Sequence, residues 1–314
     1  DWIPGFKHIH HPDFRVRLEQ IRKAVWGFNP HVLLLAFQWR YLECYALVAD
    51  ARRRGVLAVG AMDNPWLDSR KQHLMVVLNR RLRLLPFDAV WVPGEHAAQY
   101  AIRLFGRGTP IWRGLYCADS DLFRPNLSRR NWRASEWPRT FLYVGRLSVE
   151  KGVWDLVEAY RHYRNSTAYP WELLCVGDGP MRSELEGEPG IRLIGFKQPP
   201  EVAEFMAGAV VFVLPSWYEP WGVVFHEAAL SGLPIICSDA CGASVELVQD
   251  GFNGLVYRAR DVRGLAQRFC EISEGQHDLA QMGRNSASLG KRYTTSLWAN
   301  TLIRGIQQLR QRDV

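Results

Sequence analysis

Residues 210–239 read VVFVLPSWYEPWGVVFHEAALSGLPIICSD, and this stretch decides the fold. Its two ends, 210–216 and 233–239, are apolar runs of strand length, and residues 223–230 between them favour a helix. Strands that lack alternating polar residues are covered on both faces, which is typical of a parallel sheet flanked by helices. The stretch therefore predicts one strand-helix-strand unit of an α/β protein.

The same alternation extends in both directions along the chain. It predicts further strands in the second half at 141–145, 171–177 and 191–196, with helices at 153–163 and over most of the tail from 262. In the first half it predicts strands at 31–37, 56–61 and 88–94, with helices at 69–85 and 95–105. Two such series predict two Rossmann-like domains whose parallel sheets face each other across a cleft.

The polar segment LSRRNWRASEWPR, residues 127–139, separates the two series and is a candidate linker. We therefore expect an N-terminal domain over 1–126 and a C-terminal domain over 140–292. The last segment, 293–314, is expected to be a helix that packs back on the N-terminal domain.

Charge is distributed unevenly along the 314 residues, whose net charge is +7. The first 138 residues carry 21 basic and 12 acidic side chains, and the remainder carries 18 and 20. Arginine and lysine cluster at 52–54, 70–71 and 80–83, which is either a solvated helix surface or a patch that attracts phosphates or an anionic membrane face. Nucleic acid is not expected as a partner, because no nucleic-acid-binding module is present.

Apolar runs in the sequence all fall short of the roughly 20 residues that span a bilayer. We expect a cytoplasmic protein, with peripheral attachment to the inner face of the membrane as an open extension. The six cysteines are scattered, mostly within apolar segments, so we expect reduced thiols and neither a disulfide nor a metal site.

Two carboxylates stand eight residues apart in the opening stretch, Glu219 and Glu227. Pro220 and Gly222 interrupt the backbone between them, so Glu219 belongs to the loop after a strand and Glu227 to the following helix. Ligands of open α/β sheets bind beyond the carboxyl ends of the strands, and carboxylates accept hydrogen bonds from vicinal hydroxyls. The pair indicates a site for a ribose and a sugar.

Two cations follow the strand at 141–145 in the segment GRLSVEKG, which starts at Gly145. Arg146 and Lys151, five residues apart at a strand end, predict a cationic pocket for a diphosphate. The turn VGDGP, which contains Gly177, lets a ligand lie against backbone.

In the order GRL..EKG, VGDGP, LPS.YEPWG....EA and DG.NG, these motifs resemble the donor domain of the retaining glycosyltransferases of family 4, among the glycosyl transferases group 1, which have the GT-B fold. The resemblance is dense over residues 140–300 and looser over 85–125. It implies an acceptor-side N-terminal domain, here expected to lack its first strand-helix unit, and a donor-side C-terminal domain.

Carried onto this sequence, the resemblance implies that Arg146 and Lys151 hold the donor diphosphate, that Glu219 binds the transferred sugar and that Glu227 binds the ribose. Backbone amides at Gly222 and Val223 would face the donor, and Phe196 would flank the base. Such enzymes use no metal or other cofactor, and the nucleoside-diphosphate sugar, linked to UDP, GDP or ADP, is their substrate. Apart from the resemblance, the tryptophans are expected to pack in the core, and the alternative is that Trp217 and Trp221, which flank Glu219, line the sugar site by stacking on a ring face.

Family members often carry a His-Asp pair after the strand that corresponds to residues 56–61. Here the positions are Met62 and Asp63, and Asp63 is either an acceptor-side catalytic group or a turn former before Asn64 and Pro65. His8, His10 and His11 are expected to be surface residues.

The sequence thus predicts a retaining, metal-independent hexosyltransferase that uses a carbohydrate or lipid-linked acceptor in polysaccharide or glycolipid synthesis. Two alternatives remain open, a catalytically silent nucleotide-sugar binding protein and an epimerase or phosphorylase of the same fold. Singly, Glu219, Glu227 and Arg146 could also be ordinary surface or helix-start residues.

Overall fold

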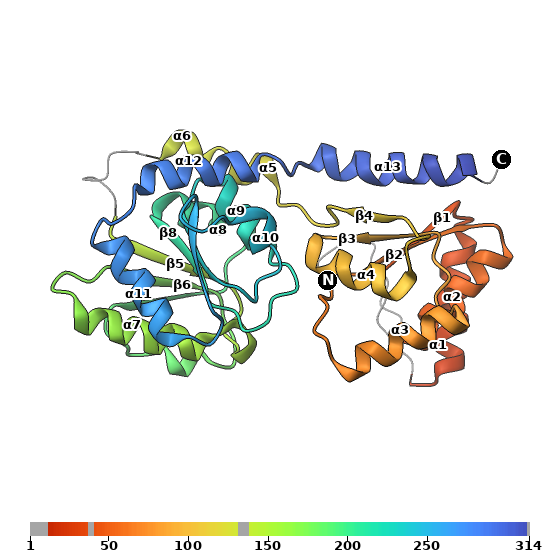
Figure 1. The fold of residues 1–314 in the computed structure, drawn as a ribbon, viewed down its shortest axis with the longest axis horizontal. Coiled ribbons are helices and arrows are strands. Elements are labelled where there is room, and N and C mark those ends of the chain that lie inside the picture. Colours follow the sequence, from red (N-terminus) through yellow and green to blue (C-terminus); the bar gives the residue numbers. More distant parts are fainter. Residues whose placement is uncertain (1–11, 37–40, 131–137, 313–314) are drawn as a thin grey trace. The chain divides into compact units, whose positions relative to one another are not determined.

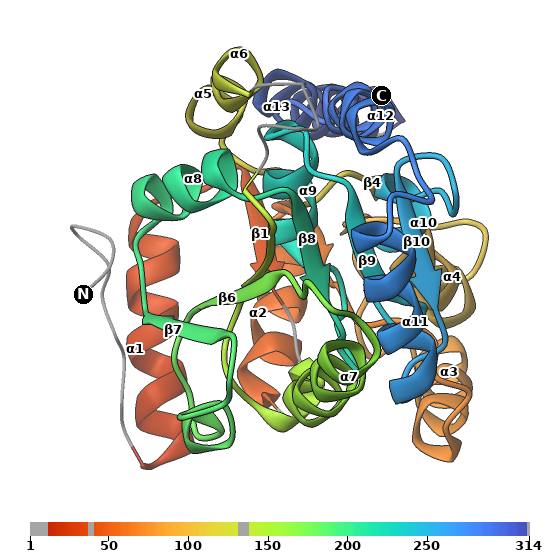
Figure 2. The ribbon, with the colours of Figure 1, turned by 90° about the vertical axis from the view of Figure 1, so that its left-hand side faces the viewer.

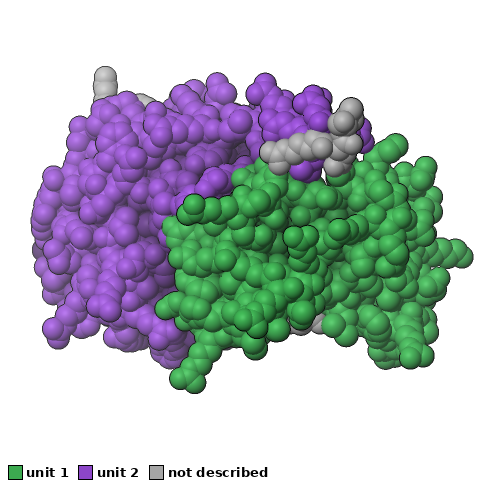
Figure 3. Space-filling view, turned by 45° about the vertical axis from the view of Figure 1, so that its right-hand side comes forward, with its two compact units in different colours: residues 1–62, 66–92, 99–112 green, residues 63–65, 93–98, 113–314 purple. Residues whose placement is uncertain are grey.

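The computed structural model describes residues 12–36, 41–130 and 138–312. The chain forms two compact units, coloured separately in Figure 3. Unit 1 comprises residues 1–62, 66–92 and 99–112, and unit 2 comprises residues 63–65, 93–98 and 113–314. Most of the predicted linker, as well as His8, His10 and His11, lies outside the described residues, and the predicted domain bounds and C-terminal packing stay predictions.

Unit 1 is built on a four-stranded sheet with the strand order β1-β2-β3-β4. Its strands are β1 (Val32–Ala36), β2 (Leu57–Ala61), β3 (Ala89–Val92) and β4 (Ile111–Arg113), and the first three pair in parallel. Its helices are α1 (Phe14–Gly27), α2 (Leu42–Arg53), α3 (Arg70–Leu82) and most of α4 (Glu95–Phe105), whose first residues belong to unit 2 (Figure 1). The strands predicted at 31–37, 56–61 and 88–94 are confirmed.

Helix α1 was not expected from the sequence. It begins after Asp13, whose side chain accepts hydrogen bonds from the amides of Arg15 (2.7 Å) and Val16 (3.1 Å). Phe14, Leu18, Ile21 and Val25 follow the spacing of one helix face, although only Leu18 is buried.

Unit 2 is built on six parallel strands in the order β10-β9-β8-β5-β6-β7 (Figure 2). They are β5 (Thr140–Val144), β6 (Glu172–Val176), β7 (Ile191–Gly195), β8 (Val211–Leu214), β9 (Ile235–Ser238) and β10 (Gly254–Tyr257). The chain runs outward from β5 to β7, returns to β8 on the other side of β5, and then runs outward again. This order is that of a Rossmann fold, and it reverses between β5 and β8.

The helices of unit 2 include both long and very short ones. They are α5 (Ser120–Phe123), α6 (Asn126–Arg129), α7 (Val153–Ser166), α8 (Pro199–Gly208), α9 (Val223–Leu230), α10 (Ser244–Leu247), α11 (Val262–Ser273), α12 (Leu279–Gly290) and α13 (Thr295–Arg312), with 3-10 turns η2 (Val149–Lys151) and η3 (Arg182–Glu184). Within the described ranges, the helices are all too short or too polar to cross a membrane.

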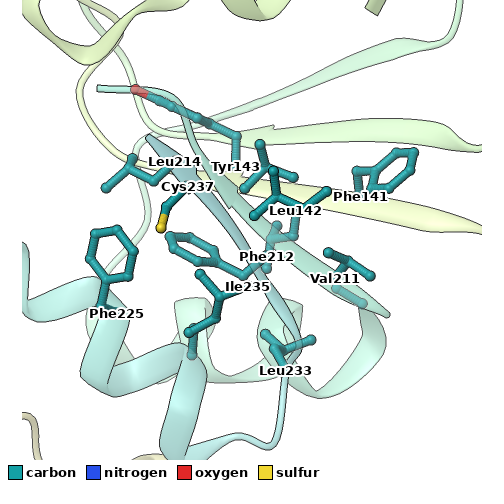
Figure 4. Packing of buried hydrophobic residues seen from close by; sticks show 14 of the residues in the cluster. Phe141, Leu142, Tyr143, Val211, Phe212, Leu214, Phe225, Leu233, Ile235 and Cys237 are labelled. Carbon is teal, nitrogen blue, oxygen red and sulfur yellow. The ribbon is translucent and has the colours of Figure 1, made fainter. Parts of the chain in front are cut away.

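The core of unit 2 is continuous through both sides of the sheet. Phe212 on β8 packs edge-on against Phe225 of α9 at a centroid distance of 5.8 Å (Figure 4). On the side of α7 and α11, Phe141 contacts Phe269 at 4.6 Å. Burying side chains of this size stabilises the fold by roughly 1.5–3 kcal/mol each, so the strand ends are held rigidly in place.

A buried arginine ties the segment before β5 to two helices of unit 2. Arg130 donates to the backbone oxygens of Met206 (3.0 Å), Ala209 (3.0 Å) and Ser231 (3.2 Å). These carbonyls lie at the carboxyl ends of α8 and α9, where no further turn of helix can accept their hydrogen bonds. Burial lowers the pKa of Arg130 to about 10, so the side chain stays charged at neutral pH.

Replacement of Arg130 should therefore be strongly destabilising. We expect Arg130→Ala to lower the free energy of unfolding by about 2–4 kcal/mol, because it leaves buried carbonyl groups without donors. The control is the neighbouring Arg129, which is exposed and pairs with Glu204 at 2.6 Å. Arg129→Ala should cost less than about 1 kcal/mol, and equal losses in urea denaturation would contradict this account.

Candidate functional site

The candidate site is formed by the loops that follow β5 and β8, the strands between which the sheet order reverses. After β5 come Gly145, Arg146 and the turn η2, which ends at Lys151. After β8 comes the loop from Pro215 to Gly222, which leads into α9. Because parallel strands end at the same edge and their connections diverge here, this edge is open to a ligand.

The two loops approach each other so closely that only glycine fits between them. Gly152 has a positive φ of 68°, and a Cβ atom added there would lie 2.0 Å from the backbone oxygen of Pro215. The amide of Trp217 donates to the backbone oxygen of Glu150 at 2.9 Å. The close approach and the hydrogen bond fix the register of the cationic loop against the acidic one.

Gly177, at the end of β6, closes the other side of the cationic loop. Its φ is 139°, and an added Cβ atom would lie 1.9 Å from the backbone oxygen of Gly145. The amide of Gly145 in turn donates a hydrogen bond to the backbone oxygen of Val176 at 3.0 Å. The predicted glycines thus bring the backbones of these loops into contact.

The predicted cation Lys151 and carboxylate Glu219 form an ion pair between the two loops. Glu219 is buried, and its backbone oxygen accepts from the amide of Gly242 at 2.8 Å. Arg146 is exposed, and within the described part of the chain no ion pair engages its guanidinium group. Arg146 is therefore available to an incoming anion, whereas Lys151 is already neutralised by Glu219.

Helix α9 begins at this edge without a side-chain cap. Gly222 is its N-cap residue, with a φ of 90°, and Val223 is its first helical residue. The first amides of a helix lack intrahelical acceptors and carry partial positive charge, so they bind anions and polar oxygens. The start of α9 is consequently open to a ligand oxygen.

Glu227 lies one turn into α9 and is half-buried. Among the described residues none forms a hydrogen bond or ion pair with its carboxyl group. Burial raises its pKa to about 7 from an ordinary value of 4.5. A partly desolvated carboxyl group without a protein partner lowers the stability of the fold when it is ionised, and it is suited to accept hydrogen bonds from a ligand.

The predicted aromatic residues differ in their exposure. Phe196 directly follows β7 on the same edge of the sheet and is 60% exposed, so it is free to contact a ring. Trp221 is only 4% exposed, and its Nε1 atom is buried without a partner among the described residues. The neighbouring Trp217 has Arg260 over its ring at 4.6 Å and donates from Nε1 to Asp155.

Asp63 is half-buried and accepts a hydrogen bond from the hydroxyl of Tyr116 at 3.2 Å. Burial, together with the charge of Asp63, raises the pKa of Tyr116 to about 12, so the tyrosine remains a donor. This bond fixes the orientation of the carboxylate. The catalytic role of Asp63 stays a prediction.

His226 also contributes to the site, although the sequence did not single it out. Its Nδ1 atom accepts from the amide of Ala118 at 2.8 Å, and its Nε2 donates to the backbone oxygen of Gly290 at 2.9 Å. Burial lowers the pKa of His226, in keeping with a neutral ring. The residue before Glu227 thus anchors α9 to two segments that are distant in the sequence.

Comparison with known proteins identifies this part of the chain. Residues 138–274 match the family described as glycosyl transferases group 1. Over these residues the chain is similar to the group 1 glycosyltransferases. The match confirms the family resemblance inferred from the motifs, and it covers all of the predicted donor-side residues from Gly145 to Glu227.

Several curated relatives that match this part of the chain are described as glycosyltransferases. The glycogen synthase of Mycobacterium tuberculosis is 30% identical over 213 residues, which are 60% of this chain and 50% of the relative. The amylovoran biosynthesis glycosyltransferase AmsK of Erwinia amylovora is 28% identical over 245 residues, or 74% of this chain and 54% of the relative. The chain thus spans about half the length of these relatives.

Solved glycosyltransferase structures share the fold of nearly the whole chain. The Anabaena protein HepE in complex with UDP superposes with a TM-score of 0.70 at 18% identity, covering 93% of this chain and 82% of that one. Sucrose-phosphate synthase from Thermosynechococcus elongatus superposes with a TM-score of 0.71 at 20% identity, and the match covers 98% of this chain and 81% of that one. The two parallel-sheet units and these neighbours confirm the predicted GT-B fold class.

Gly152 provides a test of the contact between the two loops. We expect Gly152→Ala to lower the free energy of unfolding by about 3 kcal/mol or more, because the new methyl group collides with Pro215 and the left-handed backbone is strained. Gly251 has a similar φ of 72° but open space around it. Gly251→Ala should cost only the strain, about 1 kcal/mol, and similar losses in both variants would disprove the steric argument.

Glu227 gives the ligand-free protein a pH-dependent stability. Since its folded pKa lies above its unfolded value, its contribution to stability is present below pH 4.5 and is lost as the pH rises through about 7. We expect Glu227→Gln to be more stable than wild type by about 1–3 kcal/mol at pH 8, and equal to it near pH 4.5. Urea denaturation at both pH values measures this difference.

The matched control is Glu186→Gln, since Glu186 is exposed. This variant should follow the wild-type pH dependence. If the stability of Glu227→Gln also has the wild-type pH dependence, then ionisation of Glu227 does not destabilise the folded protein, and the prediction is wrong.

Proposed function

We propose that this protein is a retaining glycosyltransferase that moves a sugar from a nucleoside-diphosphate sugar to a hydroxyl acceptor. One observation carries the proposal: two cations and two carboxylates lie on the loops and helix that follow β5 and β8, where the sheet order reverses. A nucleotide sugar combines the two chemistries that this arrangement fits, a diphosphate and vicinal hydroxyl groups.

The cations act on the diphosphate in this proposal. Arg146, which has no ion pair among the described residues, and Lys151 bind its oxygens, with the open amides at the start of α9 as additional donors. These groups stabilise the charge that develops on the leaving diphosphate, so no metal is required. Each such contact typically contributes about 3 kcal/mol to the transition state.

The carboxylates act on the hydroxyl groups. Glu227 accepts hydrogen bonds from the ribose hydroxyls, which take the place of the water lost on burial. Glu219 accepts hydrogen bonds from the hydroxyls of the transferred sugar. The exposed ring of Phe196 lies beside the base. Asp63 is proposed to orient the sugar or the acceptor hydroxyl, and its bond from Tyr116 holds it for that role.

The relatives favour transfer in the synthesis of a polysaccharide, and we propose a glycolipid as the alternative product. The AmsK relative is described as an amylovoran biosynthesis enzyme, and two of the structural neighbours, HepE and the pneumococcal O-GlcNAc transferase GtfA, hold UDP. We therefore propose a UDP-sugar as the first donor to test, and a carbohydrate or lipid-linked acceptor. A cytoplasmic location remains part of the proposal.

A thermal-shift panel tests the donor site without knowledge of the acceptor. The panel contains UDP, GDP, ADP and their common sugar conjugates, and we expect one nucleotide series to raise the melting temperature of the wild-type chain. Arg146→Ala and Glu227→Ala should lose that shift, because each removes a group that contacts the donor. Arg192→Ala, which removes an exposed arginine paired with Glu172 at 3.5 Å, serves as the control and should keep it.

No shift with any nucleotide at millimolar concentration would overturn the proposed donor site. A shift without donor hydrolysis or transfer to any of a panel of acceptors would instead favour the catalytically silent binding protein.

A further inference from the structure

Helix α3 of unit 1, which is orange in Figure 1, has three large apolar side chains exposed to solvent. Leu74 is 57% exposed, Val77 48% and Leu82 64%. Only Asn79 is buried among its 13 residues. A surface helix of a folded protein normally directs its large apolar side chains inward. In α3, Met75, Val76 and Leu78 are half-buried in this way, whereas Leu74, Val77 and Leu82 remain exposed.

The exposed residues form one continuous face. Arg70, Leu74, Val77 and Arg81 follow each other at steps of four, three and four residues, which places them in one row along a helix. We call this row the α3 stripe. Lys71 and Leu82 lie beside it and are also exposed.

The opposite side of α3 is fastened to unit 1 by polar contacts. Asn79 donates to the backbone oxygen of Leu104 at 3.0 Å and accepts from the amide of Leu85 at 3.0 Å. Arg80 donates to the backbone oxygen of Arg103 at 2.7 Å. These bonds determine which face of the helix is exposed, so the α3 stripe does not turn inward.

The cations of the stripe form no ion pair among the described residues, and the nearby carboxylate of Asp68 contacts His73 at 2.9 Å instead. Helix α3 contains no acidic residue, and within the described residues no carboxylate pairs with Arg70, Lys71 or Arg81. The stripe therefore carries cations at both ends of an apolar centre. Two copies of this face would repel each other, and a nucleic-acid backbone would leave the leucines and the valine without apolar contact.

We propose that the α3 stripe docks the protein on an anionic lipid membrane. Leu74, Val77 and Leu82 enter the boundary between head groups and acyl chains, while the arginines and Lys71 extend to the lipid phosphates. The membrane contact itself is argued from α3 alone. Its role in catalysis rests on the proposed function, in which docking would hold unit 1 beside a lipid-linked acceptor.

Vesicle flotation of the full chain tests the proposal. Vesicles of phosphatidylcholine with about one third phosphatidylglycerol should carry the wild-type protein, and vesicles of phosphatidylcholine alone should carry much less. Binding should weaken steeply between about 50 and 500 mM salt, because the attraction between the arginines and the head groups is screened.

Two double variants separate the apolar and charged parts of the stripe. Leu74→Ser with Val77→Ser, and Arg70→Glu with Arg81→Glu, should each reduce the bound fraction by at least about tenfold. The control combines Tyr169→Ser with Arg263→Glu, an exposed apolar residue and an exposed arginine of unit 2, and should bind as wild type does.

Circular dichroism and thermal unfolding establish that the variants are folded. The nucleotide shift of the donor site should be unchanged in all of them, so a failed donor site and a failed docking surface give different results. The proposal is overturned if the wild-type chain does not float with anionic vesicles, or if both α3 variants float as well as the control. A change of oligomeric state in the α3 variants, seen by gel filtration, would assign the stripe to protein contact and overturn the proposal as well.

Discussion

The reversal of strand order beside β5 is the constraint on which the candidate site depends. In a parallel sheet every strand ends at the same edge, and each connection must cross one face to reach the next strand. Because β6 and β8 lie on opposite sides of β5, the connections on the two sides of β5 pass over opposite faces of the sheet. Ligands of open α/β sheets bind in the crevice at such a point, and the segments that follow β5 and β8 here carry Arg146, Lys151, Glu219 and Glu227.

The fold stabilises this edge while leaving parts of it unsatisfied. His226 has both ring nitrogens engaged, so the helix that carries Glu227 is firmly held. Glu227 itself gains nothing in the empty protein, since burial raises its pKa and no described residue pairs with it. Burying the ionised carboxylate of Glu227 lowers the stability of the free protein. A ligand that donates hydrogen bonds to this carboxylate offsets that cost, as is typical of a binding site.

Most of the architecture could be predicted from the sequence, because the strands of unit 2 are uninterrupted apolar runs such as those at 210–216 and 233–239. Helix α1 was missed although Phe14, Leu18, Ile21 and Val25 follow a helical spacing, and β10 was missed because it has only four residues and begins with a glycine. The positions of Arg146 and Lys151 followed from their place after a strand. The contacts of the site did not follow, because Lys151 meets Glu219 across 68 residues and His226 meets Ala118 across 108. Such pairs depend on the packing of the whole unit, and no local pattern encodes them.

The ion pair between Lys151 and Glu219 also has a consequence for the order of events at this edge. In the structure, the ammonium group of Lys151 and the carboxylate of Glu219 pair with each other. A nucleotide sugar offers each of them a substitute partner, a phosphate for the lysine and a hydroxyl for the glutamate. A nucleoside diphosphate that has lost its sugar offers only the first, and Glu219 then competes with it for Lys151. In the proposed reaction, Glu219 therefore displaces the diphosphate of the product nucleotide from Lys151 once the sugar has been transferred. Loss of the sugar thus promotes release of the nucleotide before the next turnover.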